Sequence, residues 1–291
     1  MARAGLTWRG WPWRGNRPSV LSAIGWVAVE YLVGDVPVHY VERGEGSPVL
    51  ALHGAGVDHR EMMACLDPVF DAFTGYRRIY PDLPGMGRTA GPETIRSADD
   101  VLEVLLAFID GVIGDQPLLV AGHSAGGYYA QAIAGQRPEQ VVGLAMLCPL
   151  LAGIHDVPEH EVVYRSGNIG DAEFRDYFTV QTAKTLDRYQ MYVEPAARLA
   201  DQSALARIGQ RWELSTRPQE MAPYRCPTLL VTGRQDSTVG YARAWDLLEH
   251  YPRATFAVLD RAGHALPHEQ PELLHALVTE WLDRVQEHRS P

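Results

Sequence analysis

The sequence predicts an α/β domain built on a mostly parallel central sheet that is flanked by helices. From Val27 onward, short runs of β-branched and apolar residues alternate with longer runs at helical spacing. This order is typical of a parallel sheet covered by helices. The chain has 291 residues, 46% of them hydrophobic and 21% charged, which is enough to bury a large core. Its composition is not that of a disordered or fibrous chain.

We expect the sheet to begin with a β-hairpin. The runs 27–33 and 36–41 are rich in β-branched and aromatic residues, and Gly34-Asp35 between them favours a two-residue turn. Pro37 has no backbone N–H, so it confines the second strand to a sheet edge or lies at the start of that strand.

The rest of the core continues this alternation. An unbroken apolar run is typical of a strand buried on both faces, whereas apolar residues three and four apart indicate a helix. Further strands are predicted at 47–53, 77–80, 118–121, 141–147, 227–232 and 255–259. Helices are predicted at 101–112, after a capping box at 97–100, and at 125–136, 240–249 and 271–287.

The alternation stops between Pro149 and Pro223. This stretch has helical character and many aromatic and charged residues, but no strong strand pattern. We interpret it as an insertion carried on the sheet. The sequence therefore predicts three parts: a flexible N-terminal extension at 1–25, a core domain at 26–149 and 223–291, and a helical cap at 150–222.

The N-terminal segment is unusual because arginines and tryptophans precede an apolar run at 20–29. A secretory signal peptide is one interpretation. However, Gly25 interrupts the run, Glu30 follows it, and no small-x-small cleavage site closes it. The residues from Trp26 onward are also needed as the first strand. We therefore expect a tail ahead of the domain and a cytoplasmic protein.

The charge and cysteine content narrow the range of partners. Lys and Arg total 26 against 36 Asp and Glu, so the net charge is −10, which makes nucleic acid and anionic membranes poor partners. No apolar run approaches the ~20 residues that span a bilayer. Cys65, Cys148 and Cys226 lie far apart, without a Cys-x-x-Cys pair or clustered histidines. Neither a disulfide framework nor a metal site is predicted.

One short segment carries most of the chemical information. The pattern Gly-x-Ser-x-Gly at 122–126 lies between the predicted strand at 118–121 and the helix that begins at Ala125. Glycines at both ends allow a sharp turn, which exposes the hydroxyl of Ser124 at the carboxyl end of the sheet. On its own the pattern also fits a glycine-rich turn with an ordinary serine. Its place between a strand and a helix favours a nucleophile.

With this motif in place, the chain resembles the α/β-hydrolase superfamily, and within it the cap-bearing serine hydrolases: esterases, lactonases and C–C bond hydrolases. The resemblance extends from about Val27 to the C-terminus and implies a helical cap inserted late in the sheet. Five motifs carry it, in the family's order: His53-Gly-Ala-Gly56, Asp82-Leu-Pro-Gly-Met-Gly-Arg88, Gly122-His-Ser-Ala-Gly-Gly127, Gly233-Arg-Gln-Asp236 and Gly263-His264.

A serine hydroxyl is a weak nucleophile at neutral pH, so it requires a base and a group that orients the base. His264 is the predicted base. It follows the strand at 255–259 by a short loop, where the resembling enzymes place their triad histidine. His268, four residues further on, is the alternative.

Asp236 is the predicted orienting carboxylate. It lies in the loop after the strand at 227–232, which produces the nucleophile, acid and histidine order of this fold. Asp260 and Asp246 remain alternatives, although Asp260, at the end of the neighbouring strand, fits a loop cap better.

The oxyanion of an acyl-transfer intermediate requires two preorganised hydrogen-bond donors. By resemblance, these are the backbone N–H groups of Ala125 and Ala55, the latter in the glycine-rich loop after the strand at 47–53. A tight turn is the simpler interpretation of that loop. His53 and His123 are interpreted as neighbours of the site rather than as catalysts.

The cap is expected to select the substrate, because insertions at the carboxyl ends of the strands normally do so. Its aromatic residues together favour a small to medium, fairly apolar small-molecule substrate, although packing explains any single one of them better. The predicted substrate-binding residues are Gly54, His123, Tyr128, Tyr164 and Trp212.

No cofactor is predicted. Ser124 stands where haloalkane dehalogenases and many epoxide hydrolases of this superfamily have an aspartate, which disfavours both activities. The chain has no Gly-x-x-x-x-Gly-Lys-Ser/Thr loop, and neither Gly54-Ala-Gly56 nor Gly85-Met-Gly87 continues into a dinucleotide-binding pattern.

We therefore predict an ester or lactone hydrolase that acts through an acyl-Ser124 intermediate, as a monomer or homodimer. Hydrolysis of a carbon–carbon bond in a vinylogous diketone is one alternative, although several such enzymes carry Trp after the triad histidine, where this chain has Ala265. Amide cleavage, as in proline iminopeptidases, is another and would require an acidic amine-binding patch near the cap, which the sequence does not locate. A non-hydrolytic lyase, a cyclase or a small-molecule receptor on the same fold is the last. A complete set of nucleophile, base, acid and oxyanion loop favours the hydrolase.

Overall fold

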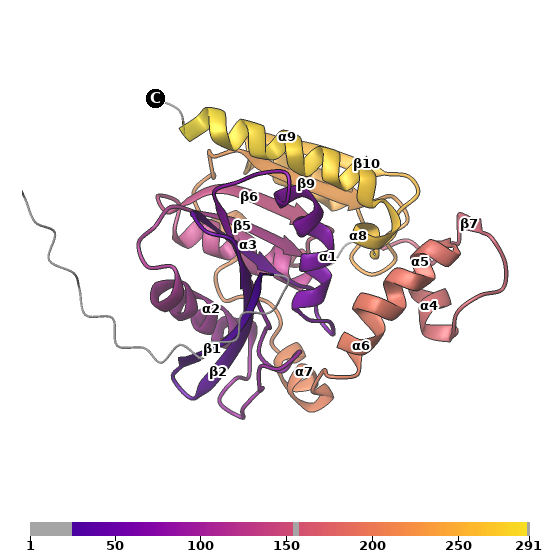
Figure 1. Ribbon diagram of the computed structural model, residues 1–291, viewed down its shortest axis with the longest axis horizontal. Helices are drawn as coiled ribbons and strands as arrows, with labels where there is room; N and C mark the ends of the chain where they lie inside the picture. Colours follow the sequence, from indigo (N-terminus) through magenta and orange to yellow (C-terminus); the bar gives the residue numbers. More distant parts are fainter. Residues whose placement is uncertain (1–24, 154–156, 290–291) are drawn as a thin grey trace, which may run out of the picture.

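The computed structural model describes residues 25–153 and 157–289, and Figure 1 shows how their elements are arranged. An eight-stranded sheet forms the centre, in the order β1-β2-β4-β3-β5-β6-β9-β10. β2 pairs antiparallel with both β1 and β4, whereas the later pairs are parallel. The predicted class, an α/β fold with a mostly parallel sheet, is confirmed. Residues 1–24 of the predicted extension lie outside the described residues.

The strands lie close to their predicted ranges. The hairpin turns at Gly34-Asp35, between the paired residues Val33 and Val36. Pro37 is the second residue of β2, and β2 meets β4 only from Tyr40 onward, so no ladder bond to β4 requires its missing N–H. The strand bounds are β1 Trp26–Val33, β2 Val36–Arg43, β3 Ser47–Leu52, β4 Tyr76–Pro81, β5 Leu118–His123, β6 Val141–Leu147, β9 Thr228–Gly233 and β10 Ala254–Leu259.

Helices cover both faces of the sheet, because alternate residues of the buried strands point to opposite sides. Leu50 and Leu52 of β3 pack on the side of α2 (Ala98–Val112) and α3 (Ala125–Gln136). The other face is covered by α1 (His59–Phe70), α8 (Leu266–Glu269) and α9 (Pro271–Arg289). No helix among the described residues combines the length and apolar character needed to cross a membrane.

Two elements differ from the sequence-based expectation. The segment 240–249, predicted as a helix, forms one of the 3-10 type at Ala242–Glu249. Helix α1 is absent from the prediction, because Pro68 interrupts its helical pattern near the end. It nevertheless forms, since the Asp58 side chain accepts a hydrogen bond from the Arg60 N–H at the first turn and one face of the helix is buried.

The segment between β6 and β9, predicted as a helical cap, contains short elements. Its two-stranded sheet was not predicted, because a strand of two residues leaves no period to detect. The elements are β7 Tyr164–Arg165, β8 Val180–Gln181, α4 Ala172–Tyr177, α5 Ala183–Arg188, a π-helical turn Tyr189–Val193, α6 Glu194–Ala197, α7 Gln202–Gly209 and a 3-10 turn Pro218–Glu220.

This segment packs over the loops at the carboxyl ends of the strands. Phe174, Phe178 and Tyr189 form one apolar cluster with Val57, after β3, and Ala265, after β10. In Figure 1, α5 accordingly lies beside α8, and the π-helical turn after α5 contacts α1. The cluster closes one side of the space above the sheet in which the predicted functional residues lie.

Candidate active site

The turn between β5 and α3 holds Ser124 in a conformation that few residues adopt. Its backbone has φ 52° and ψ −119°, a strained combination for a residue with a side chain. A Cβ added to Gly122 would lie 2.2 Å from the carbonyl oxygen of Gly126, and one added to Gly126 would lie 2.2 Å from that of Leu52. Both glycines are therefore required for the turn that projects the serine hydroxyl from the sheet.

The structure brings the three predicted triad residues into contact. The Ser124 hydroxyl donates to Nε2 of His264 over 2.9 Å, and Nδ1–H of His264 donates to Oδ2 of Asp236 over 2.8 Å. All three side chains are buried. This arrangement places a base beside the hydroxyl and a carboxylate that orients the base.

Asp236 is also fixed from its other side. Its second oxygen, Oδ1, accepts hydrogen bonds of 2.9 Å from the backbone N–H groups of Thr238 and Val239. Burial alone would raise the pKa of Asp236, but the charge and hydrogen bond of His264 and the two N–H groups outweigh it and lower the pKa. The carboxylate is therefore ionised at neutral pH, as an orienting group requires.

The alternatives for the base and the acid lie elsewhere. The ring of His268 is buried, stacks on Tyr192 and has no hydrogen-bond partner among the described residues. Burial lowers its pKa to about 3, so it stays neutral. Asp260 lines an open hollow of about 630 Å³ on the outer surface, and Asp246 faces Arg243 over 3.6 Å at the surface.

The loop after β3 lies against Ser124. A Cβ on Gly54 would be 3.3 Å from Cβ of Ser124, so the backbone of this loop approaches the serine directly. Ala55, the next residue, lines the cavity beside Ser124. Ala125 is the first residue of α3, where a backbone N–H has no partner within the helix. These two N–H groups are the ones that sequence analysis predicts as oxyanion donors.

A cavity of about 290 Å³ opens at Ser124 and His264. Its walls come from the loop after β3, the turn after β5 and the cap, and its size suits a small to medium molecule. The residues that line it are Gly54, Ala55, Gly56, Val57, Glu61, His123, Ser124, Glu173, Tyr177, Tyr189, Val193, Ala197, Thr238 and His264.

Three of the five predicted substrate-binding residues lie outside this lining, and only Gly54 and His123 belong to it. Tyr128 lies one turn along α3, where its hydroxyl accepts a hydrogen bond from the Leu214 N–H and its ring packs against Trp212. Both aromatics therefore support the end of the cap segment. The ring of Tyr164 is half exposed beneath Arg261. The lining of this cavity does not support the prediction for these three, because aromatic content does not indicate which way a side chain points.

The structure adds residues that sequence analysis missed. Tyr177 and Tyr189 form part of the cavity wall, but nothing in the sequence separates them from the other cap aromatics. Glu61 enters the cavity from α1. The spacing of Met62, Leu66 and Val69 behind it is a signal from which this helix can be recognised.

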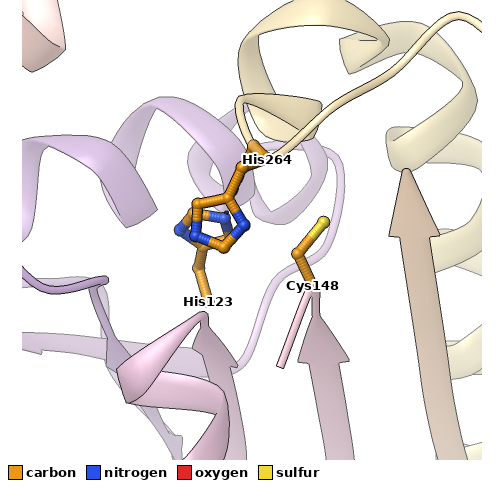
Figure 2. Close-up of side chains that lie close together, drawn as sticks. All are labelled: His123, Cys148 and His264. Atoms are coloured by element: carbon orange, nitrogen blue, oxygen red, sulfur yellow. Dashed lines mark hydrogen bonds between the residues drawn. The ribbon is translucent and has the colours of Figure 1, made fainter. Parts of the chain in front are cut away.

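Figure 2 shows His123 and His264 with their rings close together and the sulfur of Cys148 beside them at the end of β6. Although this group has the donor atoms of a metal site, both ring nitrogens of His264 are held by the triad and Nε2–H of His123 donates to the His264 carbonyl. Burial raises the pKa of the Cys148 thiol well above its usual value, so it remains protonated. We interpret the group as support for the triad.

His39, His59 and Asp82 form a second group with the donor atoms of a metal site, and their donor atoms are also engaged in hydrogen bonds. Asp82 accepts from ring nitrogens of His39 and His59, and from the backbone N–H groups of His59 and Arg88, over 2.8–2.9 Å. His53 is similarly engaged, since its Nε2 accepts from the backbone after Asp82 and its Nδ1–H donates to the Gly54 carbonyl. These histidines fix the loops around the cavity.

Comparisons with known proteins agree with this architecture. The model of the alpha/beta hydrolase family matches residues 49–277. The chain is 26% identical to the 2-hydroxy-6-oxo-6-(2'-aminophenyl)hexa-2,4-dienoic acid hydrolase of Metapseudomonas resinovorans, over 82% of this chain and 85% of that protein. It is 27% identical to a 2-hydroxy-6-oxononadienedioate/2-hydroxy-6-oxononatrienedioate hydrolase of Burkholderia vietnamiensis, over 86% of this chain and 92% of that protein. The crystal structure of an alpha/beta superfamily hydrolase from Oenococcus oeni superposes with a TM-score of 0.82 and 27% identity, covering 88% of this chain and 99% of that one.

Proposed function

The chain belongs to the α/β-hydrolase family, and on that premise we propose that it is a serine hydrolase that cleaves an ester or lactone of a small to medium, fairly apolar substrate. The observation that carries the proposal is the continuous hydrogen-bonded line from Ser124 through His264 to Asp236, at the edge of a cavity. A hydroxyl, a base and an ionised carboxylate in this order are the parts that nucleophilic catalysis by serine requires.

In the first half of the reaction, Oγ of Ser124 attacks the carbonyl carbon of the substrate while Nε2 of His264 takes the hydroxyl proton. The oxyanion that forms accepts hydrogen bonds from the backbone N–H groups of Ala55 and Ala125. Its collapse breaks the bond to the leaving oxygen, which receives the proton from His264. The alcohol departs, or stays attached in the case of a lactone, and the acyl group remains on Ser124.

The second half repeats these steps with water. His264 takes a proton from a water molecule as the oxygen of that water attacks the acyl carbon. The second oxyanion collapses, Oγ of Ser124 leaves with the proton from His264, and the carboxylic acid is released. Throughout, Asp236 keeps one proton of the imidazole on Nδ1, so Nε2 is the nitrogen that takes up and returns the other proton.

The charges around the cavity favour an ester over an acidic substrate. Among the described residues that line it, none is Lys or Arg; Glu61 lies against His123, and Glu173 contributes a further carboxylate. An anionic group buried without a counter-ion carries a large desolvation cost. The cavity therefore suits an acyl group without a negative charge.

Hydrolysis of a carbon–carbon bond is the second candidate, and the relatives named above are the observation in its favour. Those enzymes act, by their names, on dienoic and dienedioic acids, whose carboxylates would meet Glu173 and no Lys or Arg in the described lining of this cavity. This mismatch is the reason that we place ester hydrolysis first.

The proposal is tested with p-nitrophenyl esters of two to eight carbons, a fluorophosphonate probe and a 2-hydroxy-6-oxohexa-2,4-dienoate, each added to the wild type and to Ser124→Ala. We expect ester turnover and covalent labelling in the wild type and neither in Ser124→Ala. Faster turnover of the dienoate than of every ester would establish the second candidate instead. A wild type without labelling or turnover would refute both.

A further inference from the structure

Glu61 is a buried carboxylate beside the nucleophile that the hydrolytic steps do not use. It lies in the first turn of α1, is 1% exposed and lines the cavity. A buried carboxylate is costly unless it is paired and hydrogen-bonded, so its presence here requires an explanation.

Both oxygens of Glu61 are directed at residues next to catalytic groups. Oε2 accepts a hydrogen bond of 2.8 Å from the Gly54 N–H, and Gly54 precedes the oxyanion donor Ala55. Oε1 lies 3.1 Å from Nδ1 of His123, the residue before Ser124. The opposite nitrogen, Nε2, lies 3.0 Å from the carbonyl oxygen of His264. Glu61 therefore connects the loop after β3, the turn after β5 and the loop that carries the base.

The atoms that surround the two ring nitrogens of His123 indicate the charges of His123 and Glu61. A carbonyl oxygen only accepts, so Nε2 of His123 carries a proton. Nδ1 lies 3.1 Å from a carboxylate oxygen without the geometry of a hydrogen bond, and this contact is attractive only when Nδ1 carries a proton. Burial opposes both charges, but the opposite charge of the partner raises the pKa of His123 and lowers that of Glu61 to about 2. Both pKa shifts favour the charged pair, with the proton on His123.

We propose that Glu61 is a positioning residue of the oxyanion hole, which acts through the Gly54 N–H and through an ion pair with a doubly protonated His123. The carboxylate orients the peptide that precedes the Ala55 N–H. Alone, its negative charge would repel the oxyanion. The imidazolium, with its ring 4.8 Å from that of His264, offsets this charge at the site where the oxyanion forms (Figure 2). This inference rests on the proposed acyl transfer.

The proposed ion pair predicts that Glu61 and His123 do not act independently. His123→Gln keeps an N–H donor for the His264 carbonyl but leaves the Glu61 carboxylate without its cation. Glu61→Gln removes the charge, and its amide still accepts from Gly54 and donates to a neutral His123. In the double variant both charges are absent.

The experiment measures kcat/KM for the best p-nitrophenyl ester and the inhibition constant of an alkylboronic acid, whose adduct with Ser124 imitates the oxyanion. We expect His123→Gln to lower kcat/KM roughly 10–100-fold, mainly through kcat, and to weaken the boronate in parallel. Glu61→Gln should lose less than about ten-fold, and the double variant should recover most of what His123→Gln lost. Glu103→Gln, an exposed carboxylate on α2, is the matched control.

A double variant as impaired as His123→Gln, or more so, would overturn the inference, because a packing role does not predict recovery. Nitrogen-15 NMR of histidine-labelled protein provides a reading that requires no turnover. We expect two protonated ring nitrogens on His123 at pH 7.5 in the wild type and one in Glu61→Gln. A neutral His123 in the wild type would refute the ion pair even if esters are hydrolysed. A charged His123 in a protein that neither turns over esters nor labels would refute the proposed function.

Discussion

Replacing Asp236 with Asn provides the sharpest test of how the site works, because the surrounding donors dictate how the new amide must lie. The backbone N–H groups of Thr238 and Val239 both point at Oδ1, and an N–H only donates. The amide oxygen of Asn must therefore take that position. The amide nitrogen then takes the position of Oδ2, 2.8 Å from Nδ1 of His264.

In this orientation the amide donates to Nδ1, so His264 must carry its proton on Nε2. Nε2 is the atom that has to accept the proton of Ser124, and in this tautomer it cannot. A wrong tautomer in an otherwise intact triad lowers kcat by about 10⁴-fold, which corresponds to roughly 5.5 kcal/mol of barrier. Because binding contacts are unchanged, KM should change little.

The assay is steady-state hydrolysis of a p-nitrophenyl ester, with thermal melting to establish that the variant is folded. Asp260→Asn is the matched control, since Asp260 is the neighbouring acid that the sequence leaves as an alternative and the structure places on the outer surface. A folded Asp236→Asn that keeps more than one-hundredth of the wild-type kcat would refute the tautomer argument. Equal losses in the two variants would show that a general change in the region is responsible.

Three further predictions concern stability. Gly126→Ala places a Cβ 2.2 Å from the Leu52 carbonyl oxygen and should lower the free energy of unfolding by about 1–3 kcal/mol, measured by denaturant titration; an unchanged midpoint would contradict the close approach. Tyr128→Phe leaves the buried Leu214 N–H without its acceptor and should lower the free energy of unfolding by about 1–3 kcal/mol, with KM unchanged. A raised KM would instead indicate that Tyr128 contacts the substrate. Because the pKa of Glu61 is about 2 instead of 4.5, its stabilisation is complete above about pH 4.5 and is lost as the pH falls toward 2. Glu61→Gln should therefore flatten the acid decline in unfolding free energy over that window, and an unaltered decline would count against the ion pair.

Much of the fold follows from local patterns. The hairpin turn at Gly34-Asp35 and the boundary between β5 and α3 depend on neighbouring residues, so the sequence alone locates them. Helix α1 was missed although Met62, Leu66 and Val69 recur at helical spacing; Pro68 near its end weighs against a helix, and burial of one face stabilises it. That helix carries Glu61, and the proposed positioning role was missed with it.

The sequence by itself determined the fold class and the turn at Ser124, because both depend on spacings of a few residues and on glycines that a Cβ would exclude. It also narrowed the base to His264 or His268. Only the tertiary structure decided which histidine meets the serine and which cap aromatics face the cavity. Those outcomes depend on contacts between residues far apart in the chain, such as the 140 positions between Ser124 and His264, and packing of the whole sheet sets such contacts.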